Sequence, residues 1–320
     1  MKYYLLVVLV LSIVISYFMP KSFAQAQGED LKGRITISGA WALYPMAVKW
    51  ADEFQKVYPD IKIDVSAGGA GKGITDALSE AVDLGMVSRD INPVEIQKGI
   101  WTLAVAKDAV VATVNANNPV LKDILAKGIS KGIFQKIFIS GDVKTWGQVV
   151  EGNNTDTINV YTRSDACGAA ETWAKYLHKT QEDLTGIGVY GDPGVANAVK
   201  KDKSAIGFNN INFAYDVNTG LPVPGIMVVP IDINGDGIID NGENFYQNLP
   251  TLMKAIAQGK YPSPPARELY IVSKGKPQRK EVLAFLHWML TDGQKFVPEN
   301  GFINVSQKRI NEDLEKIGKE

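Results

Sequence analysis

Cysteine and histidine are almost absent from this chain of 320 residues. Cys167 is its only cysteine, and His178 and His287 are its two histidines. A single cysteine cannot form an internal disulfide, so the fold must be stabilised by a packed core and not by cross-links. One cysteine and two separated histidines also exclude a metal site of the Cys/His type.

An excess of charge is lacking too, and so are internal repeats and low-complexity segments. The chain has 34 Lys and Arg residues against 35 Asp and Glu residues, which gives a formal net charge of −1. This balance offers no electrostatic basis for binding nucleic acid or an anionic membrane surface. Any anion site must therefore be local, built from a few arginines and backbone N–H groups.

The first 26 residues have the pattern of a secretory signal. Lys2 gives a positive start, residues 3–19 are almost entirely apolar, and Pro20 ends the run. Small residues at alternate positions suit signal peptidase, so we expect cleavage near Ala24 or Ala26 and a periplasmic or other extracytoplasmic location. The alternative is an uncleaved anchor, because the apolar run approaches spanning length. The lack of a nearby cysteine argues against a lipid anchor.

Removal of this segment leaves roughly 295 residues, more than one core comfortably holds, which indicates two lobes. Strand-like and helix-like segments alternate along them, and this alternation predicts an α/β fold. The helical pattern is clearest at 45–58, where Trp50 and Phe54 belong to one apolar stripe. The expected strands are 34–38, 61–65, 82–86, 109–114, 158–162, 204–208, 225–231 and 269–272, and the expected helices are 45–58, 73–79, 118–127, 168–178, 193–201, 280–290 and 293–298.

Three strand-to-helix loops, at 38–45, 66–73 and 163–170, are rich in small residues. Free N–H groups and the helix dipole favour an anion where a helix begins, and small residues let it approach the backbone. Ligands of open α/β sheets also sit beyond the carboxyl ends of strands, where these loops lie. The alternative is steric, since such turns are often Gly-rich without any ligand. No Gly-Lys-Ser/Thr closes the loop at 66–73, which disfavours a nucleotide hydrolase.

Two arginines strengthen the case for an anion. Arg89 and Arg163 each follow a predicted strand. A guanidinium at a strand end can hold an oxyanion with two parallel N–H bonds. The alternative is an ion pair, for which Asp83 and Asp165 are the nearest acidic partners in the sequence.

Further motifs follow in one order along nearly the whole mature chain. They are Gly39…Pro45 with Lys49-Trp50-Ala51…Phe54, the Gly-rich loop at 66–73, Val82-Asp83-Leu84-Gly85…Ser88-Arg89, Phe138-Ile139-Ser140-Gly141…Thr145-Trp146, Arg163…Cys167-Gly168…Trp173, Ala205-Ile206-Gly207-Phe208, Tyr261-Pro262…Arg267-Glu268-Leu269-Tyr270, Phe285…Trp288, and Asp292-Gly293-Gln294…Gly301-Phe302. Together they resemble the phosphate-type periplasmic substrate-binding proteins of ABC transporters. So many collinear motifs are hard to obtain by chance.

The resemblance implies a two-lobed periplasmic-binding-protein fold of type II, with mixed sheets, a hinge of two crossing strands and an interlobe cleft. Lobe one would comprise 30–114 and 225–320, and lobe two 115–224. The chain would be a monomeric solute-binding protein, without enzymatic activity or an organic cofactor. It would capture a small inorganic oxyanion, first of all phosphate, and deliver it to the membrane permease of an ABC transporter. The implied ligand-binding residues are Ala40, Trp41, Leu43, Tyr44, Gly69, Ala70, Gly71, Ser88, Arg89, Arg163, Cys167, Gly168 and Ala169.

Several hydroxyl groups that this family uses are missing here. Leu43 stands where a Thr is common, Ala70 where a Ser is common, and Cys167-Gly168-Ala169 replaces Ser-Gly-Thr. A neutral hydrogen bond contributes about 0.5–1.5 kcal/mol net, and one to a charged group contributes more. The loss of several could weaken phosphate binding or change the preferred anion.

Cys167 has a setting that favours reactivity, because a helix start and Arg163 should both lower its thiol pKa. Neither histidine is placed by the sequence to act as its base, so a small lining residue is the expected role. Two alternative functions remain open. One is a secreted phosphate-ester hydrolase, for which only Cys167, Ser88 or Asp90 could act. The other is a calcium-stabilised extracellular sensor or adhesion protein on the same fold.

Residues 232–243 match the twelve-residue calcium-loop pattern, with Gly237 at the sixth position. They follow a strand and not a helix, which indicates a single structural Ca²⁺ site; the alternative is an acidic Asn/Gly turn. We expect calcium to raise the melting temperature. The expected ligands are Asp232, Asn234, Asp236, the carbonyl of Ile238, Asp240 and Glu243.

Overall fold

The computed structural model describes residues 31–318. The predicted signal segment, residues 1–26, lies outside these residues. Across 31–318, no helix is both long enough and apolar enough to span a bilayer.

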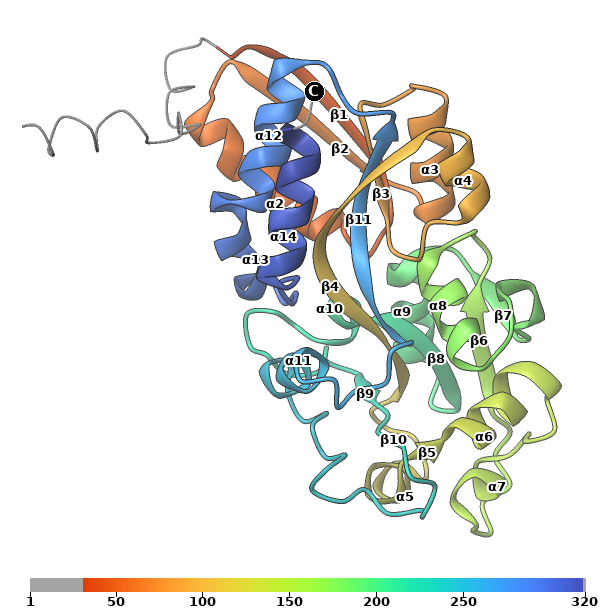
Figure 1. The fold of residues 1–320 in the computed structure, drawn as a ribbon. Coiled ribbons are helices and arrows are strands. Elements are labelled where there is room, and N and C mark those ends of the chain that lie inside the picture. The colour runs from red at the N-terminus through yellow and green to blue at the C-terminus, as the bar shows by residue number, and fades with distance from the viewer. Residues whose placement is uncertain (1–30, 319–320) are drawn as a thin grey trace, which may run out of the picture.

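The strands form one large sheet and one small pair. They are β1 Gly33–Gly39, β2 Ile61–Ala67, β3 Leu84–Val87, β4 Ile100–Asn115, β5 Ile129–Ser130, β6 Asn159–Arg163, β7 Ile187–Val189, β8 Ala205–Asn210, β9 Ile226–Val228, β10 Ile231–Asp232 and β11 Ala266–Lys274. The large sheet has nine strands in the order β2-β1-β3-β11-β4-β8-β6-β7, with β9 also paired to β4, and β10 pairs with β5 (Figure 1).

Parallel and antiparallel pairs alternate in blocks along the large sheet. β1 runs parallel to β2 and β3, and β6 runs parallel to β7 and β8. Between these blocks, β11 is antiparallel to both β3 and β4, and β4 is antiparallel to β8. The mixed sheet predicted from the sequence is therefore confirmed.

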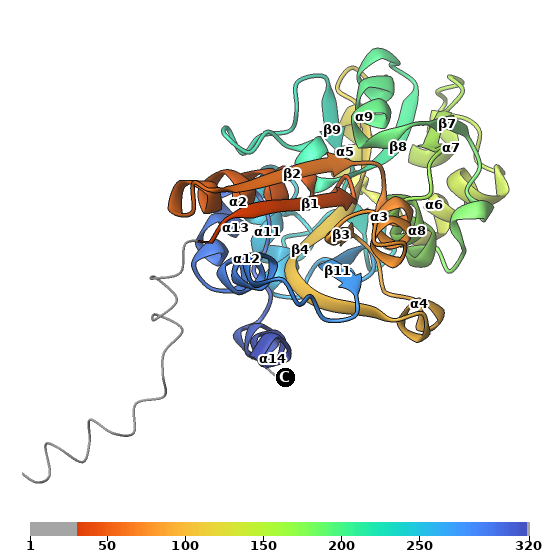
Figure 2. The ribbon, with the colours of Figure 1, turned by 90° about the horizontal axis from the view of Figure 1, so that it is seen from above.

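Helices cover both sides of the strands, and α2, α12 and α14 lie opposite α3 around β1–β3 (Figures 1 and 2). The helices are α2 Tyr44–Val57, α3 Ala70–Leu78, α4 Pro93–Gln97, α5 Leu121–Lys127, α6 Lys131–Gln135, α7 Trp146–Val150, α8 Gly168–Tyr176, α9 Gly191–Lys201, α10 Ile211–Ala214, α11 Leu249–Ala257, α12 Lys280–Leu290, α13 Phe296–Glu299 and α14 Gln307–Gly318. Short π and 3₁₀ turns occupy Lys136–Ser140, Gln181–Asp183 and Asp292–Lys295.

The start of α2 shows how the sequence determines these elements. Pro45 occupies the first turn of the helix, where its fixed φ is suitable and its missing N–H is not needed. Trp50 and Phe54 are fully buried on the inner face, and the Trp50 indole donates a hydrogen bond of 2.9 Å to the Gly293 carbonyl. This helix is thus tied to the C-terminal part of the chain.

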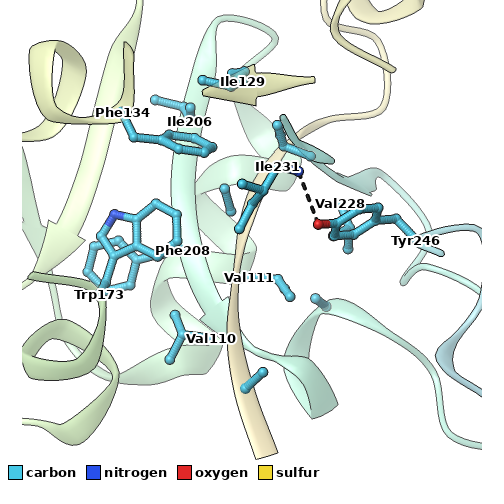
Figure 3. Close-up of a cluster of buried hydrophobic side chains, with 14 of the residues drawn as sticks. Val110, Val111, Ile129, Phe134, Trp173, Ile206, Phe208, Val228, Ile231 and Tyr246 are labelled. Atoms are coloured by element: carbon cyan, nitrogen blue, oxygen red, sulfur yellow. Dashed lines mark hydrogen bonds between the residues drawn. The ribbon is translucent and has the colours of Figure 1, made fainter. Parts of the chain in front are cut away.

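The buried apolar residues separate into two main cores. One contains residues of β1, β3, α2, α12 and α14, together with Leu103–Ala106 of β4. The other contains Phe134, Trp173 and Phe208, together with Ala109–Ala112 of β4 (Figure 3). Among the strands of residues 31–318, β4 and β11 alone supply residues to both cores, so these two strands join two lobes, as the predicted fold requires.

The segment between β9 and β11 packs with the second lobe. Its buried residues Tyr246, Leu252 and Tyr261 belong to the core that contains Trp173. The Tyr246 hydroxyl accepts a hydrogen bond of 3.1 Å from the Ile231 N–H (Figure 3). The sequence prediction had assigned 225–320 as a whole to lobe one, and the domain limits remain a prediction.

Candidate functional site

The predicted anion loops of the two lobes meet face to face. Ser88, at the end of β3, lies against Gly168, the first residue of α8. A Cβ atom added to Gly168 would lie 2.2 Å from the Ser88 carbonyl oxygen and 2.3 Å from its hydroxyl oxygen. Glycine is therefore required at Gly168 for this approach of the two lobes.

The Gly-rich loop before α3 makes a second contact across the lobes. Gly69 has a φ of +94°, and a Cβ atom there would lie 2.8 Å from the Ala166 carbonyl oxygen. A Cβ atom on Gly71 would lie 3.3 Å from the Cβ of Ala166. The start of α3 in lobe one and the loop before α8 in lobe two are thus adjacent.

Trp41 makes the third contact. Its ring lies 6.0 Å from that of Tyr190 in an edge-to-face arrangement, and 3.3 Å from a Cβ atom placed on Gly191. The Trp41 indole nitrogen is buried and has no hydrogen-bond partner within residues 31–318. An unpartnered donor therefore lies at this interlobe contact.

Other predicted ligand residues lie in the interior of the two lobes. Ala40, Leu43 and Ala70 have no exposed surface and belong to the first core, against which Tyr44 also packs. Ala169 belongs to the second core. Their side chains pack within the lobes, so their contribution to a ligand would come from the backbone.

Arg89 is held by two glutamates. Its guanidinium donates to both carboxylate oxygens of Glu95, at 2.9 and 2.7 Å, and its Nε lies 2.9 Å from Glu171. Asp83, the nearest acidic partner in the sequence, pairs with Arg279 instead. The ion-pair alternative holds for Arg89, but the partner predicted from local sequence, Asp83, is wrong.

The pKa values of the two glutamates are shifted in opposite directions. Burial raises the pKa of Glu171, as does repulsion by Glu95 and Asp90, and the charge of Arg89 only partly offsets them. Burial acts in the same direction on Glu95, but hydrogen bonds from Arg89 and Asn92 lower its pKa below the usual value. Glu171 is therefore the more readily protonated of the pair.

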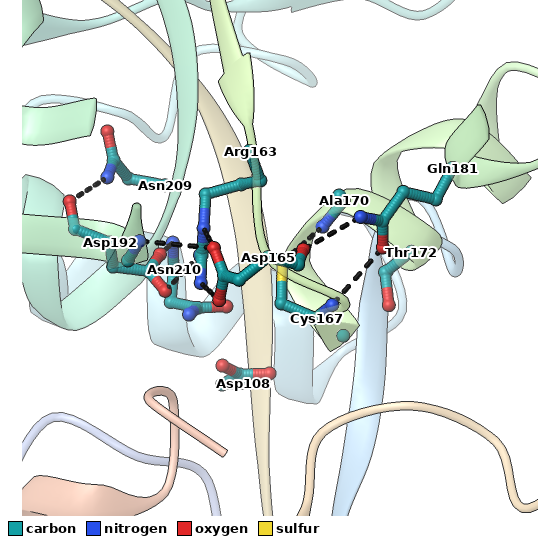
Figure 4. A network of polar contacts seen from close by, with 12 residues as sticks. Asp108, Arg163, Asp165, Cys167, Ala170, Thr172, Gln181, Asp192, Asn209 and Asn210 are labelled. Carbon is teal, nitrogen blue, oxygen red and sulfur yellow. Dashed lines mark hydrogen bonds and ion pairs between the residues drawn. The ribbon is translucent and has the colours of Figure 1, made fainter. Parts of the chain in front are cut away.

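Arg163 is completely buried between two aspartates (Figure 4). Its Nε and one terminal nitrogen donate to Asp165 at 2.8 and 2.6 Å, and the other terminal nitrogen donates to Asp192 at 2.6 Å. Burial opposes the charge, but the carboxylates outweigh it and raise the Arg163 pKa. Asp165 is the partner expected from the sequence, whereas Asp192, at the start of α9, was missed.

Cys167 is the N-cap residue of α8, and its sulfur accepts a hydrogen bond of 3.4 Å from the Ala170 N–H. Its own N–H donates to Gln181 at 3.2 Å (Figure 4). Burial raises the pKa of the Cys167 thiol to about 12, although Arg163 acts in the opposite direction. The predicted lowering of this pKa is wrong, because desolvation exceeds the effect of the arginine and the helix start.

Sequence reasoning assigned no role to Arg267, which lies on β11 opposite Asp108 of β4. It donates to the two Asp108 oxygens at 2.8 and 3.2 Å and to the Thr172 hydroxyl at 2.9 Å. It also donates to the Gly168 carbonyl and to Asn210. The signal that could have revealed this pair was a carboxylate in one mostly apolar strand and a guanidinium in another.

A small cavity of about 130 Å³ lies beside this network. Three cationic side chains face it, namely Arg89, Lys175 and Arg267, against two carboxylates, Asp90 and Glu171. A larger hollow of about 270 Å³, beside Asp83 and Arg279, is lined by none of the predicted ligand residues. The lining of the smaller cavity thus has more cationic than anionic side chains.

The predicted calcium residues form the irregular segment after β10. Asp232 and Glu243 are each 6% exposed, whereas Asp236 and Asp240 lie at the surface. Among residues 31–318, no three His, Cys, Asp or Glu side chains are gathered as a ready-made metal site. The calcium site stays a prediction.

Comparison with known proteins gives a consistent result. The family model described as "PBP superfamily domain" matches residues 24–293. "Phosphate-binding protein PstS" of Bacillus subtilis is 29% identical over 290 residues, which cover 90% of this chain and 86% of that protein. "Protein SphX" of Synechococcus elongatus is 28% identical and covers 94% of this chain and 85% of that protein.

Solved structures show the same fold. A putative phosphate ABC transporter substrate-binding protein from Clostridium perfringens, solved with bound phosphate, has a TM-score of 0.71 and 22% identity, and the match covers 86% of this chain and all (100%) of that one. An ABC-type phosphate transport receptor from Vibrio cholerae has a TM-score of 0.63 and 20% identity, over 85% of this chain and 100% of that one. The predicted two-lobed α/β fold is confirmed.

Proposed function

Because the chain belongs to the PBP superfamily, whose domain model matches residues 24–293, we propose that it captures phosphate between its two lobes and delivers it to the membrane permease of an ABC transporter. The names of PstS of B. subtilis and of the C. perfringens structure support phosphate as the ligand. The family is one of binding proteins and not an enzyme class.

The observation that carries this proposal is the meeting of the predicted loops across the two lobes. Ser88 lies against Gly168, and Gly69 lies against the backbone of Ala166. The helices α3 and α8 both begin at this place. An anion between the lobes would therefore meet two helix starts at once, which bind anions through free N–H groups and the helix dipole.

Most of the hydrogen-bond donors at this place are backbone N–H groups. The first N–H groups of a helix have no acceptor within it, which applies to Ala70 and Gly71 in α3 and to Gly168 and Ala169 in α8. The buried, unpartnered indole N–H of Trp41 is a further donor. These groups compensate for the family hydroxyls that this chain lacks.

The arginines contribute less net charge than their number suggests. Arg89 is paired with Glu95 and Glu171, and Arg163 with Asp165 and Asp192. Their guanidinium charges are thus largely balanced before any ligand arrives. The arginines fix the loops that present N–H groups, and we expect affinity to depend more on these groups than on either charge.

A hydrolase is not supported. A catalytic cysteine needs a thiolate, whereas the Cys167 thiol has a pKa of about 12. A sensor or adhesion role finds no support among the relatives either. We therefore keep transport as the function, with the exported, extracytoplasmic location that it requires.

The test is to identify the ligand carried through native purification by mass spectrometry, and then to titrate the ligand-free protein with phosphate, arsenate, sulfate, molybdate and tungstate by calorimetry. Phosphate should bind at one site per chain. Failure of all five anions to bind would overturn the proposal.

A matched pair of variants tests the location. Ser88→Ala removes a hydroxyl at the interlobe contact and should weaken phosphate binding at least about tenfold, since a hydrogen bond to a charged group contributes about 1.5–3 kcal/mol. Ser79→Ala removes an exposed hydroxyl bonded to the Thr75 carbonyl and should leave the affinity unchanged. Equal affinities in the two variants would place the site elsewhere.

A further inference from the structure

The acidic segment 232–243 is fixed at both ends to the second lobe, outside the proposed phosphate site. Asp232 lies in β10 and pairs with Ser130 of β5. The Ile239 N–H donates a hydrogen bond of 2.9 Å to the Ala126 carbonyl. The segment is therefore a loop with set ends, and its middle, around Asp236, is exposed.

The spacing of its oxygen atoms is that of a calcium loop. Positions 1, 3, 5, 9 and 12 carry side-chain oxygens, and position 7 supplies a carbonyl. Gly237, at position 6, has a φ of +75°, and Gly235 has a φ of +79°. The sharp turn that brings such oxygens to one side is thus present in the backbone.

The loop closes on its own first and last residues. The two Asp232 oxygens accept hydrogen bonds from the Gly235 and Gly237 N–H groups at 2.7 and 3.1 Å. One oxygen of Glu243, Oε1, accepts from the Ile233 and Asn234 N–H groups at 2.7 and 3.1 Å. Positions 1 and 12 are therefore both held against the backbone of the same turn.

The second oxygen of Glu243 is the observation that points to a ligand. Glu243 is 6% exposed, and its Oε2 is buried with no hydrogen-bond partner within residues 31–318. Buried carboxylate oxygens are almost always paired with a donor or a cation. Oε1 is anchored on the loop backbone, so Oε2 is the oxygen at position 12 that remains available to a cation.

Charge supports a cation at this place. The twelve residues contain four carboxylates and no Lys or Arg. Asp236 and Asp240 are exposed and accept hydrogen bonds from the nearby N–H groups of Ile238 and Gly242, at 2.9 and 2.6 Å, and Asp236 also accepts one of 3.0 Å from the Asn234 side chain. Such turn contacts exchange easily with water, so both carboxylates can rotate inward when a cation relieves their repulsion.

We propose that residues 232–243 bind one Ca²⁺ ion, which joins the buried carboxylates of Asp232 and Glu243 to the exposed ones of Asp236 and Asp240. Ca²⁺ accepts six to eight oxygens in flexible geometry, whereas Mg²⁺ demands a near-ideal octahedron, so this irregular loop selects calcium. The ion stabilises the second lobe and takes no part in holding phosphate.

The test is a calorimetric titration of the chelator-treated protein with CaCl₂, together with melting curves in CaCl₂, in MgCl₂ and in chelator. One Ca²⁺ should bind per chain, with a dissociation constant of about 10⁻⁴–10⁻³ M or tighter, and the melting temperature should rise in CaCl₂. Absence of binding at 10 mM CaCl₂, about tenfold above that range, would overturn the proposal. An equal rise in MgCl₂ would do the same, since it would mark a nonspecific divalent effect.

Variants locate the site. Asp236→Asn keeps the hydrogen bond to the Ile238 N–H and removes one exposed charge, so it should weaken Ca²⁺ binding at least tenfold and leave the melting temperature in chelator unchanged. Glu243→Gln should abolish binding. Asp142→Asn, at an exposed carboxylate outside the loop, should bind Ca²⁺ like the wild type. Wild-type Ca²⁺ affinity in Asp236→Asn and Glu243→Gln would show that the ion binds elsewhere.

Discussion

Arg267 and Asp108 face each other across β11 and β4, the two strands that join the lobes, and the guanidinium donates to both carboxylate oxygens at 2.8 and 3.2 Å. Burial raises the pKa of Asp108 although Arg267 acts to lower it. The same guanidinium donates to the Gly168 carbonyl and to Asn210 of the second lobe. One ion pair thus connects the hinge strands to the start of α8.

Removing both members of this pair should cost less stability than the sum of the two single losses. Arg267→Met or Asp108→Asn each leaves an uncompensated buried group, and breaking a buried ion pair costs about 3–5 kcal/mol. The double variant should be more stable than the sum of the two losses predicts, by about 2 kcal/mol. Denaturant unfolding of the four proteins measures this coupling, and additive losses would contradict it.

Gly168→Ala should prevent closure without unfolding the protein. A Cβ atom there would lie 2.2 Å from the Ser88 carbonyl oxygen, a clash that exists only when the lobes meet. The apparent affinity falls in proportion to the fraction of molecules that can reach the closed state. We expect phosphate to bind at least tenfold more weakly, with an unchanged melting temperature.

Gly132→Ala is the control for this substitution, because a Cβ atom at Gly132 has no neighbour within 4 Å. Calorimetry gives the affinities, and small-angle X-ray scattering reports compaction on adding phosphate. Normal compaction and affinity in Gly168→Ala would show that the contact between Gly168 and Ser88 is not part of closure.

Glu171→Gln should strengthen phosphate binding. Glu171 lies 2.9 Å from the Arg89 Nε and faces the cavity beside Arg89, Lys175 and Arg267. Neutralising it frees Arg89 and removes repulsion, so we expect about threefold to tenfold tighter binding at neutral pH and low salt. Because the pKa of Glu171 is raised, the wild-type carboxyl also becomes neutral as the pH falls, and the two affinities should converge.

Calorimetry at several pH values measures this ratio of affinities, with Glu182→Gln as the control at an exposed position. An ordinary glutamate is protonated below about pH 4. If Glu171→Gln still bound phosphate more tightly than the wild type there, the charge of Glu171 would not be the cause. Weaker phosphate binding in Glu171→Gln would show instead that the Glu171 carboxylate is needed to position the groups of the site.

Local sequence predicted the elements whose signal is local. The strand at 34–38, the helix at 45–58 and the start of α8 at Gly168 all rest on periodicity or turn residues within one segment, and the structure has each of them. The prediction failed where polar residues interrupt the pattern. β4 runs from Ile100 to Asn115, but only 109–114 was expected, because Lys107 and Asp108 break the apolar run.

Contacts between segments that are distant in the sequence could not be predicted from local sequence patterns. Asp83 pairs with Arg279, which lies 196 residues further along the chain, and Asp192 joins Arg163 only through the approach of α9 to β6. The helix α14 was missed because its sequence is mostly polar and buries few residues, among them Ile310 and Ile317. Ion pairs and burial are set by tertiary packing, on which neighbours in sequence carry little information.

Cys167 should be inert in the folded protein, because its thiol pKa is raised and not lowered as the sequence predicted. The residue is 5% exposed, and burial raises its thiol pKa to about 12, whereas a free cysteine has a pKa of about 8.5. Since only the thiolate reacts, labelling by a disulfide reagent at pH 8 should be at least about a hundredfold slower than for free cysteine. One thiol per chain should react promptly in guanidinium chloride, and none in Cys167→Ser. Fast labelling of the native protein, with a midpoint below about pH 8.5, would mean that Arg163 and the helix start outweigh burial at this site after all.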